Sequence, residues 1–363
     1  MEAFSANIKE DLKPPRVNIG IIGWIRANLF NGIFNSILTI VMLFLLWKTI
    51  PPLLQWAFVD STWLAGSAFC RQSPGGACWS IISKNFRFII FGFYPYELQW
   101  RPFLAMIILF SLLFYSRNRN NWRKSLGYAW IAGLLLMGIL MKGGLLGLKS
   151  VETTQWGGLP LTLLLAVFGL TAAYPLGVVL ALGRQSKMKG VKVLSILYIE
   201  LIRGVPLISL LFMSSIIFPL FLPEGITINK ILRAQVAIIL FTAAYIAEVV
   251  RGGLQGMTKG QYEAAESLGL NYYLTLRLVI LPQALKIVIP PTVSILISAF
   301  KDTSLVVIIA LFDLLKTTQS VLSNPEWMGF SREAYIFIAI LYFAGCFSMS
   351  NYSRKLEREL SRE

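Results

Sequence analysis

The sequence predicts an all-α integral membrane protein with about eight transmembrane helices. Hydrophobic residues make up 56% of its 363 residues and charged residues only 14%. The mean hydropathy is +0.66, far from the value of a soluble globular domain. Apolar windows of about twenty residues recur, and a helix of that length crosses roughly 30 Å of hydrocarbon. The windows are continuous, whereas barrel strands would alternate apolar and polar residues over about ten positions.

The predicted spans follow these windows. They lie near 28–47, 102–115, 126–141, 159–182, 194–222, 231–250, 282–300 and 334–349. The fifth is interrupted by the polar stretch ELIRGVP, in which Gly204 and Pro206 both weaken a helix. A kink that supports gating and a simple helix irregularity both fit this pattern. A short apolar continuation at 305–315 follows the seventh window, and a long mixed segment at 48–101 separates the first two.

Basic loops orient the bundle. The loops at 116–125 and 184–192 each contain several Lys and Arg residues and no acidic residue, and such loops collect on the cytoplasmic side. With alternating spans, both termini and the 251–281 region are then cytoplasmic, and 48–101 faces outward. The same rule accounts for the net charge of +15, so no nucleic-acid partner is expected.

Several kinds of chemistry are excluded by residue usage. The chain has no histidine and only three cysteines, which argues against haem, zinc or histidine proton-relay sites, and no metal site is expected. Cys70 and Cys78 fall in the outward segment, where an oxidising compartment permits a disulfide. The sequence leaves open whether these two pair.

The polar stretch GQYEAAESLGL stands out between two apolar windows. Thr258 and Gln261 have the S/T-x-x-E/Q spacing of a capping box, which predicts a helix that begins near Lys259. Gly269 is placed to end this helix and Asn271 to cap a second one. The sequence therefore predicts a helix, a turn and a second helix on the cytoplasmic side.

One face of the first helix is small and mostly apolar. It is formed by Tyr262, Ala264, Ala265, Leu268 and Gly269. Small residues allow another protein to approach closely, while Glu263 and Glu266 remain available to water or basic partners. An ordinary surface helix has the same pattern, so helix physics alone leaves both interpretations open.

The spacing around this helix resembles a known motif. EAAESLG followed by LNYYLTLRLVILP matches E-A-A, three residues, Gly, nine residues, an aliphatic residue, any residue, Leu-Pro. The matching residues are Glu263, Ala264, Ala265, Gly269, Val279, Leu281 and Pro282, within the 258–282 loop. This resembles the coupling loop of permease subunits of ATP-binding-cassette importers, with Val279 where that family more often has Ile.

Further motifs narrow the resemblance to the polar-amino-acid branch of these permeases. They are YIELIRGVPLISLLF (198–212), LPQALKIVIPP (281–291) and KDTSLV (301–306), in the same order. The similar region covers roughly 156–352, and the long permeases of general amino-acid uptake systems share an N-terminal extension. The resemblance thus implies an extension at 1–156 with about three spans and a periplasmic loop at 48–101, a five-helix type I importer core at 157–352 and a cytoplasmic tail at 353–363.

The resemblance also implies a division of labour. Two permeases form the path, two cytoplasmic ATPase subunits bind ATP and Mg²⁺, and a periplasmic amino-acid-binding protein delivers substrate. This chain has no G-x-x-x-x-G-K-[ST] phosphate loop, so it is expected to be neither an enzyme nor a cofactor binder. Ala264 and Ala265 would let the helix sit deep in an ATPase groove, Glu263 would pair with a basic residue there, Gly269 would permit the turn, and Pro282 would open the seventh span.

Polar residues inside the windows are the second clue to function, because charge in hydrocarbon is costly and usually faces a cavity or a partner. The pairs Glu200 with Arg203 and Glu248 with Arg251 have the i,i+3 spacing of intrahelical ion pairs. The candidate substrate-path residues follow a span and precede another apolar stretch, as at a broken helix. They are Lys301, Asp302, Thr303 and Ser304.

The expected protein is therefore a multi-pass permease of the bacterial inner membrane, surrounded by lipid, that carries an amino acid. The long form favours a heterodimer with a different permease chain. A self-contained secondary carrier is the alternative, and it would take up substrate without ATP. A membrane-embedded enzyme lacks support, because no nucleophile motif or metal-ligand cluster is present.

Overall fold

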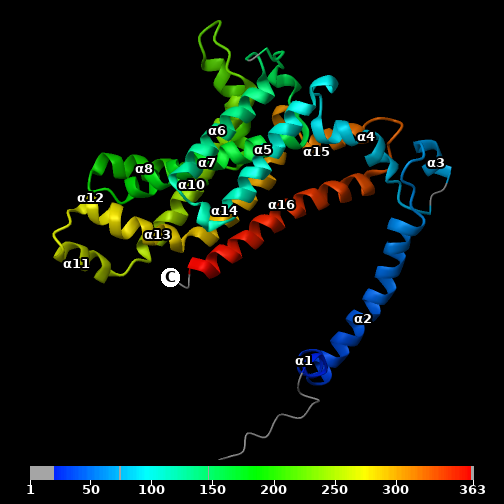
Figure 1. The fold of residues 1–363 in the computed structure, drawn as a ribbon, viewed down its shortest axis with the longest axis horizontal. Coiled ribbons are helices and arrows are strands. Elements are labelled where there is room, and N and C mark those ends of the chain that lie inside the picture. Colours follow the sequence, from blue (N-terminus) through cyan, green and yellow to red (C-terminus); the bar gives the residue numbers. More distant parts are fainter. Residues whose placement is uncertain (1–19, 73–74, 146, 361–363) are drawn as a thin grey trace, which may run out of the picture. The chain divides into compact units, whose positions relative to one another are not determined.

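The computed structural model describes residues 20–72, 75–145 and 147–360 and is helical apart from one two-residue strand (Figure 1). The elements are α1 (Gly20–Asn28), α2 (Ile33–Leu54), α3 (Ser67–Gln72), α4 (Ser80–Phe91), α5 (Trp100–Ser116), α6 (Lys124–Lys142), α7 (Gly158–Arg184), α8 (Lys189–Arg203), α9 (Leu207–Phe212), α10 (Lys230–Gln255), α11 (Lys259–Ser267), α12 (Tyr272–Leu274), α13 (Leu281–Ile287), α14 (Ile289–Asp302), β1 (Phe312–Asp313), α15 (Leu314–Leu322) and α16 (Ser331–Leu360).

Seven helical segments of the described chain are long and apolar enough to cross a membrane, and an eighth is added if the bent pair α8 and α9 forms one span. The predicted all-helical membrane fold is confirmed. The bend between Lys189–Arg203 and Leu207–Phe221 measures 102°, and it falls at the RGVP sequence where Gly204 and Pro206 weaken the helix.

Packing divides the chain after Trp79 into two units. In the first unit, α2 continues through a π-helical stretch, so its candidate span runs over Ile33–Val59. Pro51 and Pro52, expected in a loop, therefore lie inside this helix. Membrane helices tolerate proline where local π adjustments satisfy the freed carbonyl groups, and the π-helical stretch begins three residues after Pro52.

The end of the first unit is a compact loop. Cys70 and Cys78 form a disulfide with their Cα atoms 5.8 Å apart. The ring of Trp79 stacks on that of Trp63 at 5.7 Å between centroids. A Cβ atom on Gly76 would lie only 1.8 Å from the carbonyl oxygen of Asp60, so this crossing of the chain requires glycine.

The core of the second unit is the contact between α7 and α10. Four small residues recur every fourth position along α7 and are buried: Gly169, Ala173, Gly177 and Ala181. A Cβ atom on Gly177 would lie 2.6 Å from the side chain of Ile246 and 2.9 Å from the carbonyl oxygen of Ala243. This is the small-xxx-small packing that lets membrane helices approach closely.

The division of the chain differs from the predicted boundary at 156/157, because residues after Trp79 pack with the following helices. Helix α4 contacts α7, α15 and α16. A Cβ atom on Gly158, whose φ is +64°, would lie 1.9 Å from the carbonyl oxygen of Ile90, and Thr317 Oγ1 donates a hydrogen bond to the carbonyl of Ile89 at 2.8 Å. Backbone contacts thus join α4 to the region predicted as the core.

Helices α5 and α6 are joined by a buried arginine. Arg101 is fully buried and donates hydrogen bonds to the carbonyl oxygens of Leu140 (2.7 Å) and Lys149 (2.8 Å). The hydroxyl of Tyr94 donates to the carbonyl of Met141 at 2.9 Å. The last carbonyls of α6 have no partner within the helix, and a cation is favourable at that end. These side chains therefore cap α6.

Two further boundaries differ from the prediction. The helical run after the polar loop breaks at Val288, so the span begins at Ile289 and Pro282 instead opens the short helix α13 that precedes it. The last helix, α16, continues through Leu360 without a break. The predicted tail at 353–363 is therefore helical in its described part, because polar residues such as Glu359 can extend a helix beyond the membrane.

Candidate coupling loop and membrane cavity

Helix α11 begins where the sequence predicts, but not by the predicted capping box. Thr258 occupies the N-cap position and its side chain makes no cap hydrogen bond. The side-chain oxygen of Gln261 accepts a hydrogen bond from Gln283 Nε2 at 2.9 Å. The capping-box prediction is wrong because Gln261 has a partner in α13, and this contact ties the first turn of α11 to the returning chain.

The end of α11 follows the predicted signals. Gly269 has a φ of +73° and donates its N–H to the carbonyl of Glu266 at 2.9 Å, while Leu270 donates to Ala265 at 3.2 Å. This is a Schellman motif, which favours glycine in the left-handed region. Asn271 then caps the next helix, since its side chain accepts a hydrogen bond from the N–H of Leu274 at 2.9 Å.

The two sides of α11 differ in exposure. Ala265 is 2% exposed and Tyr262 packs against the hydrophobic core of the unit. Glu263 and Ala264 are exposed, and Leu268 is 79% exposed. Ala265 therefore anchors the helix to its own chain, and Ala264 is the alanine left open to a partner. Leu268 adds an apolar side chain that the sequence motif does not include.

Helix α11 is firmly attached on both sides. Ile280 and Ala284, on the returning chain, are buried in one cluster with Val250 and Leu254 of α10. A Cβ atom on Gly253 would lie 2.9 Å from the carbonyl of Ala284. Because α10 and α13 approach this closely, a force on α11 is passed to both helices together.

Five charged residues gather where α7, α8 and α10 meet, and we refer to them as the Glu248 cluster. They are Arg184, Glu200, Arg203, Glu248 and Arg251. Glu248 pairs with Arg251 as the i,i+3 spacing predicts, with Arg251 Nε 3.0 Å from Glu248 Oε1. It also lies 3.4 Å from Arg184 and 3.5 Å from Arg203.

The predicted pair of Glu200 with Arg203 is not formed. Glu200 instead accepts a hydrogen bond from Arg184 at 2.8 Å, because α8 packs against the end of α7. Arg203 lies at the last position of α8, directly before the bend, and its guanidinium is 3.5 Å from Glu248. Tertiary partners outweigh intrahelical spacing here, since each i,i+3 pair contributes only a few tenths of a kcal/mol.

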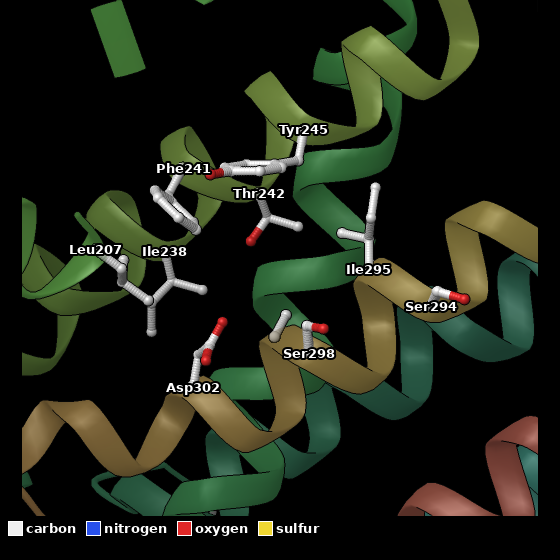
Figure 2. Close-up of a pocket in the computed structure, with 10 residues that line it drawn as sticks. Leu207, Ile238, Phe241, Thr242, Tyr245, Ser294, Ile295, Ser298 and Asp302 are labelled. Atoms are coloured by element: carbon white, nitrogen blue, oxygen red, sulfur yellow. The ribbon is translucent and has the colours of Figure 1, made fainter. Parts of the chain in front are cut away.

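A cavity of about 320 Å³ lies between α9, α10 and α14 (Figure 2). Half of its lining residues are apolar and half carry a polar group. The residues are Leu207, Ile238, Phe241, Thr242, Tyr245, Ser294, Ile295, Ser298, Ala299 and Asp302. Ser294 and Ser298 are exposed although they lie within a span, so this cavity is open on one side. Hydroxyl groups facing an open cavity can bind a polar solute that hydrocarbon would exclude.

Asp302 is the only charged residue of that lining. Its carboxylate points into the cavity, toward Thr242 (Figure 2). It makes no hydrogen bond or ion pair with any residue in the described ranges. An unpaired carboxylate within a membrane span is costly and usually functional, which makes Asp302 the strongest candidate for contact with a solute.

The other three predicted path residues lie elsewhere. Lys301 is exposed, Ser304 is half-buried, and neither lines the cavity. Thr303 is fully buried and donates a hydrogen bond to the carbonyl of Phe300 at 2.7 Å. Of the four residues, the structure therefore places only the Asp302 side chain at the cavity. The sequence signal that was missed is the four-residue spacing of Ser294, Ser298 and Asp302, which places them on one face of α14.

A fully buried carboxylate, Asp313, lies in the chain between α14 and α16. It accepts hydrogen bonds from the N–H groups of Leu315 (3.2 Å) and Lys316 (3.0 Å) and from the Tyr342 hydroxyl (3.4 Å). Burial raises the pKa of Asp313 to about 6, although these hydrogen bonds act in the opposite direction. Asp313 caps α15 and is one of the residues that the sequence did not single out.

No metal centre is found in the described part of the chain, where no group of three or more Cys, Asp or Glu side chains could hold an ion. The arrangement instead offers two functional features. They are an anchored polar helix outside the membrane spans and a half-open cavity within them.

Comparison with known proteins places these features in context. Residues 173–362 match the family described as "Binding-protein-dependent transport system inner membrane component". The chain is 50% identical over 341 residues to the inner membrane amino-acid ABC transporter permease protein YhdY of Escherichia coli (strain K12), covering 93% of this chain and 92% of the relative. Both figures include the N-terminal extension.

Two further proteins are similar. The glutamate/glutamine/aspartate/asparagine transport system permease protein BztC of Rhodobacter capsulatus is 38% identical, with 96% of each chain covered. The crystal structure of an amino acid ABC transporter with histidines is 32% identical with a TM-score of 0.50, covering 56% of this chain and 92% of that one. The solved structure therefore corresponds to about half of the present chain.

Proposed function

The chain belongs to the family of binding-protein-dependent transport system inner membrane components, and from this we propose that α11 is its coupling helix and the cavity beside Asp302 its amino-acid path. It is the permease subunit of an ATP-binding-cassette amino-acid importer, an inner-membrane protein whose ATPase activity lies in partner subunits. The family implies ATPase subunits and a binding protein as partners.

The anchoring of α11 is the observation that carries the coupling proposal. Its exposed side presents Glu263, Ala264 and Leu268, which suit a groove with an apolar floor and a basic rim. Its other side is held by Ala265 and by the Gln261 to Gln283 hydrogen bond. A helix fixed in this way moves together with α10 and α13, so closure of an ATPase dimer would rotate these helices as one body.

The cavity supports the path proposal. A free α-amino acid has an ammonium and a carboxylate, and Asp302 can accept hydrogen bonds from the ammonium. The hydroxyls of Ser294 and Ser298 can donate to the carboxylate. The volume of about 320 Å³ is at the lower end of ligand sites, which fits a small solute. The open side of the cavity would then be closed by the second permease.

We further propose that two ATPase subunits bind the permease pair, that the second permease is a different chain, and that both termini are cytoplasmic. The basic loops support this orientation. The long extension supports the heterodimer, because the family resemblance is to long permeases.

Copy counting tests the assembly. The full chain, tagged and purified in mild detergent from its native membranes, should bring two ATPase copies and one different permease, identified by mass spectrometry. Two copies of this chain would replace the heterodimer with a homodimer. Recovery of the chain alone, with solute uptake in vesicles that lack ATP, would support a secondary carrier instead.

A further inference from the structure

The end of the cavity nearest α11 is formed by Tyr245, and the Glu248 cluster lies directly behind it. Glu248 follows Tyr245 by three residues on α10, so the two side chains share one face of the helix. The guanidinium of Arg203 lies over the Tyr245 ring, 5.6 Å from its centroid, and 3.5 Å from Glu248. Leu207, four residues after Arg203, lines the same cavity.

We propose that Arg203 and Glu248 form the barrier that closes this end of the cavity, and that it opens when Arg203 leaves Glu248 while Arg184 and Arg251 remain paired with it. The direction in which the barrier passes solute rests on the proposed function. The barrier itself rests on the geometry of α8, α9 and α10.

Arg203 is the most loosely held arginine of the cluster. Within the described ranges its ion pair is with Glu248 alone, at 3.5 Å, and its Nε atom is buried without a hydrogen-bond partner, whereas Arg184 also binds Glu200 and Arg251 also binds Gln255. The other two arginines contact Glu248 at 3.4 Å (Arg184) and 3.0 Å (Arg251). Because a carboxylate without any cationic partner would be costly to bury, two remaining arginines make it feasible for the third to leave.

Arg251 of the cluster and Lys187 beside it contact the chain on the two sides of α11. Arg251 donates a hydrogen bond to Gln255 at 2.7 Å, at the last residue of α10 before that loop. The ammonium of Lys187, three residues after Arg184, lies 5.2 Å from the ring centroid of Tyr272 in α12. A displacement of α11 would therefore pull on both arginines that retain Glu248. Such a pull would favour or oppose the release of Arg203 from Glu248 without any contact between α11 and the cavity.

Arg203 and Glu248 are thus positioning residues, and accessibility of the cavity is the appropriate readout. In the assembled transporter, Cys346→Ser leaves the disulfide intact, and Ser298→Cys then places a thiol in the cavity. Inside-out vesicles without nucleotide are treated with a sulfonate-bearing methanethiosulfonate, which does not cross membranes. We expect Arg203→Met and Glu248→Gln each to raise the labelling rate about tenfold. Arg203→Lys, which keeps the charge that attracts Glu248, should stay within about twofold of the parent.

The matched control is Lys192→Met, which removes a cation from an exposed position of the same helix outside the cluster. An unchanged rate in Arg203→Met, or an equal rise in Lys192→Met, would overturn the proposal. If Arg203→Met does not assemble with its ATPase partners, Tyr245→Leu takes its place. It leaves every charge and removes the ring between Arg203 and the cavity. A similar rise supports the barrier, and an unchanged rate overturns it.

The same vesicles separate this inference from the proposed function. A mixture of the standard amino acids should slow labelling of Ser298→Cys if the cavity is the substrate path. A faster rate in Arg203→Met without any protection by amino acids would support the barrier and contradict the assigned substrate. Protection without a faster rate would support the path and overturn the barrier.

Discussion

Asp302→Asn is the most direct test of the cavity, because the two side chains have nearly the same shape and differ in charge. Asp302 has no hydrogen-bond or ion-pair partner among the described residues, so the substitution removes no such contact within the protein. A hydrogen bond to a charged group contributes about 1.5 to 3 kcal/mol. Its loss corresponds to a rise in the KM for uptake of about ten- to hundredfold.

The assay is ATP-driven uptake into proteoliposomes that contain the complete transporter, with the amino acid that the wild type takes up fastest from a radiolabelled panel. Lys301→Gln is the matched control, since it removes a charge from the neighbouring exposed residue. An N-acetylated analogue of the amino acid lacks the ammonium, so it should inhibit uptake by the wild type much less than the free amino acid does. In Asp302→Asn, the analogue and the free amino acid should inhibit uptake more equally. If Asp302→Asn and Lys301→Gln change the KM to the same extent, Asp302 does not bind the ammonium.

Three further outcomes follow from local features. Gly269→Ala places a Cβ atom at a φ of +73°, which costs about 1 to 2 kcal/mol, and we expect less solute carried per ATP hydrolysed. The control is Gly260→Ala, in the first turn of α11 with open space around it, which should leave that ratio unchanged. The denatured, unreduced chain should react with one equivalent of a maleimide and the reduced chain with three, because Cys70 and Cys78 are joined; three equivalents before reduction would contradict the bridge. Since burial raises the pKa of Asp313 from 3.8 to about 6, the folded state is favoured by its protonation. The stabilisation is full below pH 3.8 and is lost as the pH rises through 6, by about 3 kcal/mol. Asp313→Asn should therefore flatten the decline of the melting temperature over this pH range, and an unchanged decline would contradict it.

The fold of the proposed coupling loop was predictable to the extent that its signals are local. Gly269 and Asn271 act on backbone groups within a few residues of themselves, so their roles could be inferred from spacing. The capping box failed because Gln261 finds its partner in Gln283, 22 residues further along the chain. A side chain with a tertiary partner cannot be assigned from local spacing, even in a motif as regular as this one.

The cavity was predictable in part. A charged residue in a membrane window indicates a functional site, and this placed Asp302 among four candidates. In α14, Asp302 lies on a different face of the helix from Lys301, and Thr303 follows the helix end. Ser294 and Ser298 precede Asp302 at intervals of four residues, so their positions in the sequence indicate which face Asp302 shares. Tyr245 could not be found in this way, because its role depends on how α10 packs against α14 rather than on its own neighbours in the sequence.

The position of α4 could not be predicted, because its closest approach to the following helices is made by backbone and glycine rather than by a recognisable side-chain pattern. Gly157 and Gly158 pair with β1, the short strand that follows α14 after the stretch Thr303–Ile309. The carbonyl of Ile90 in α4 packs directly on Gly158. Asp302 is therefore connected through β1 to α4. Any movement of the α14 end during transport must either carry α4 with it or be resisted by it. Helix α4, although it lies in the predicted extension, thus packs in the same unit as α14.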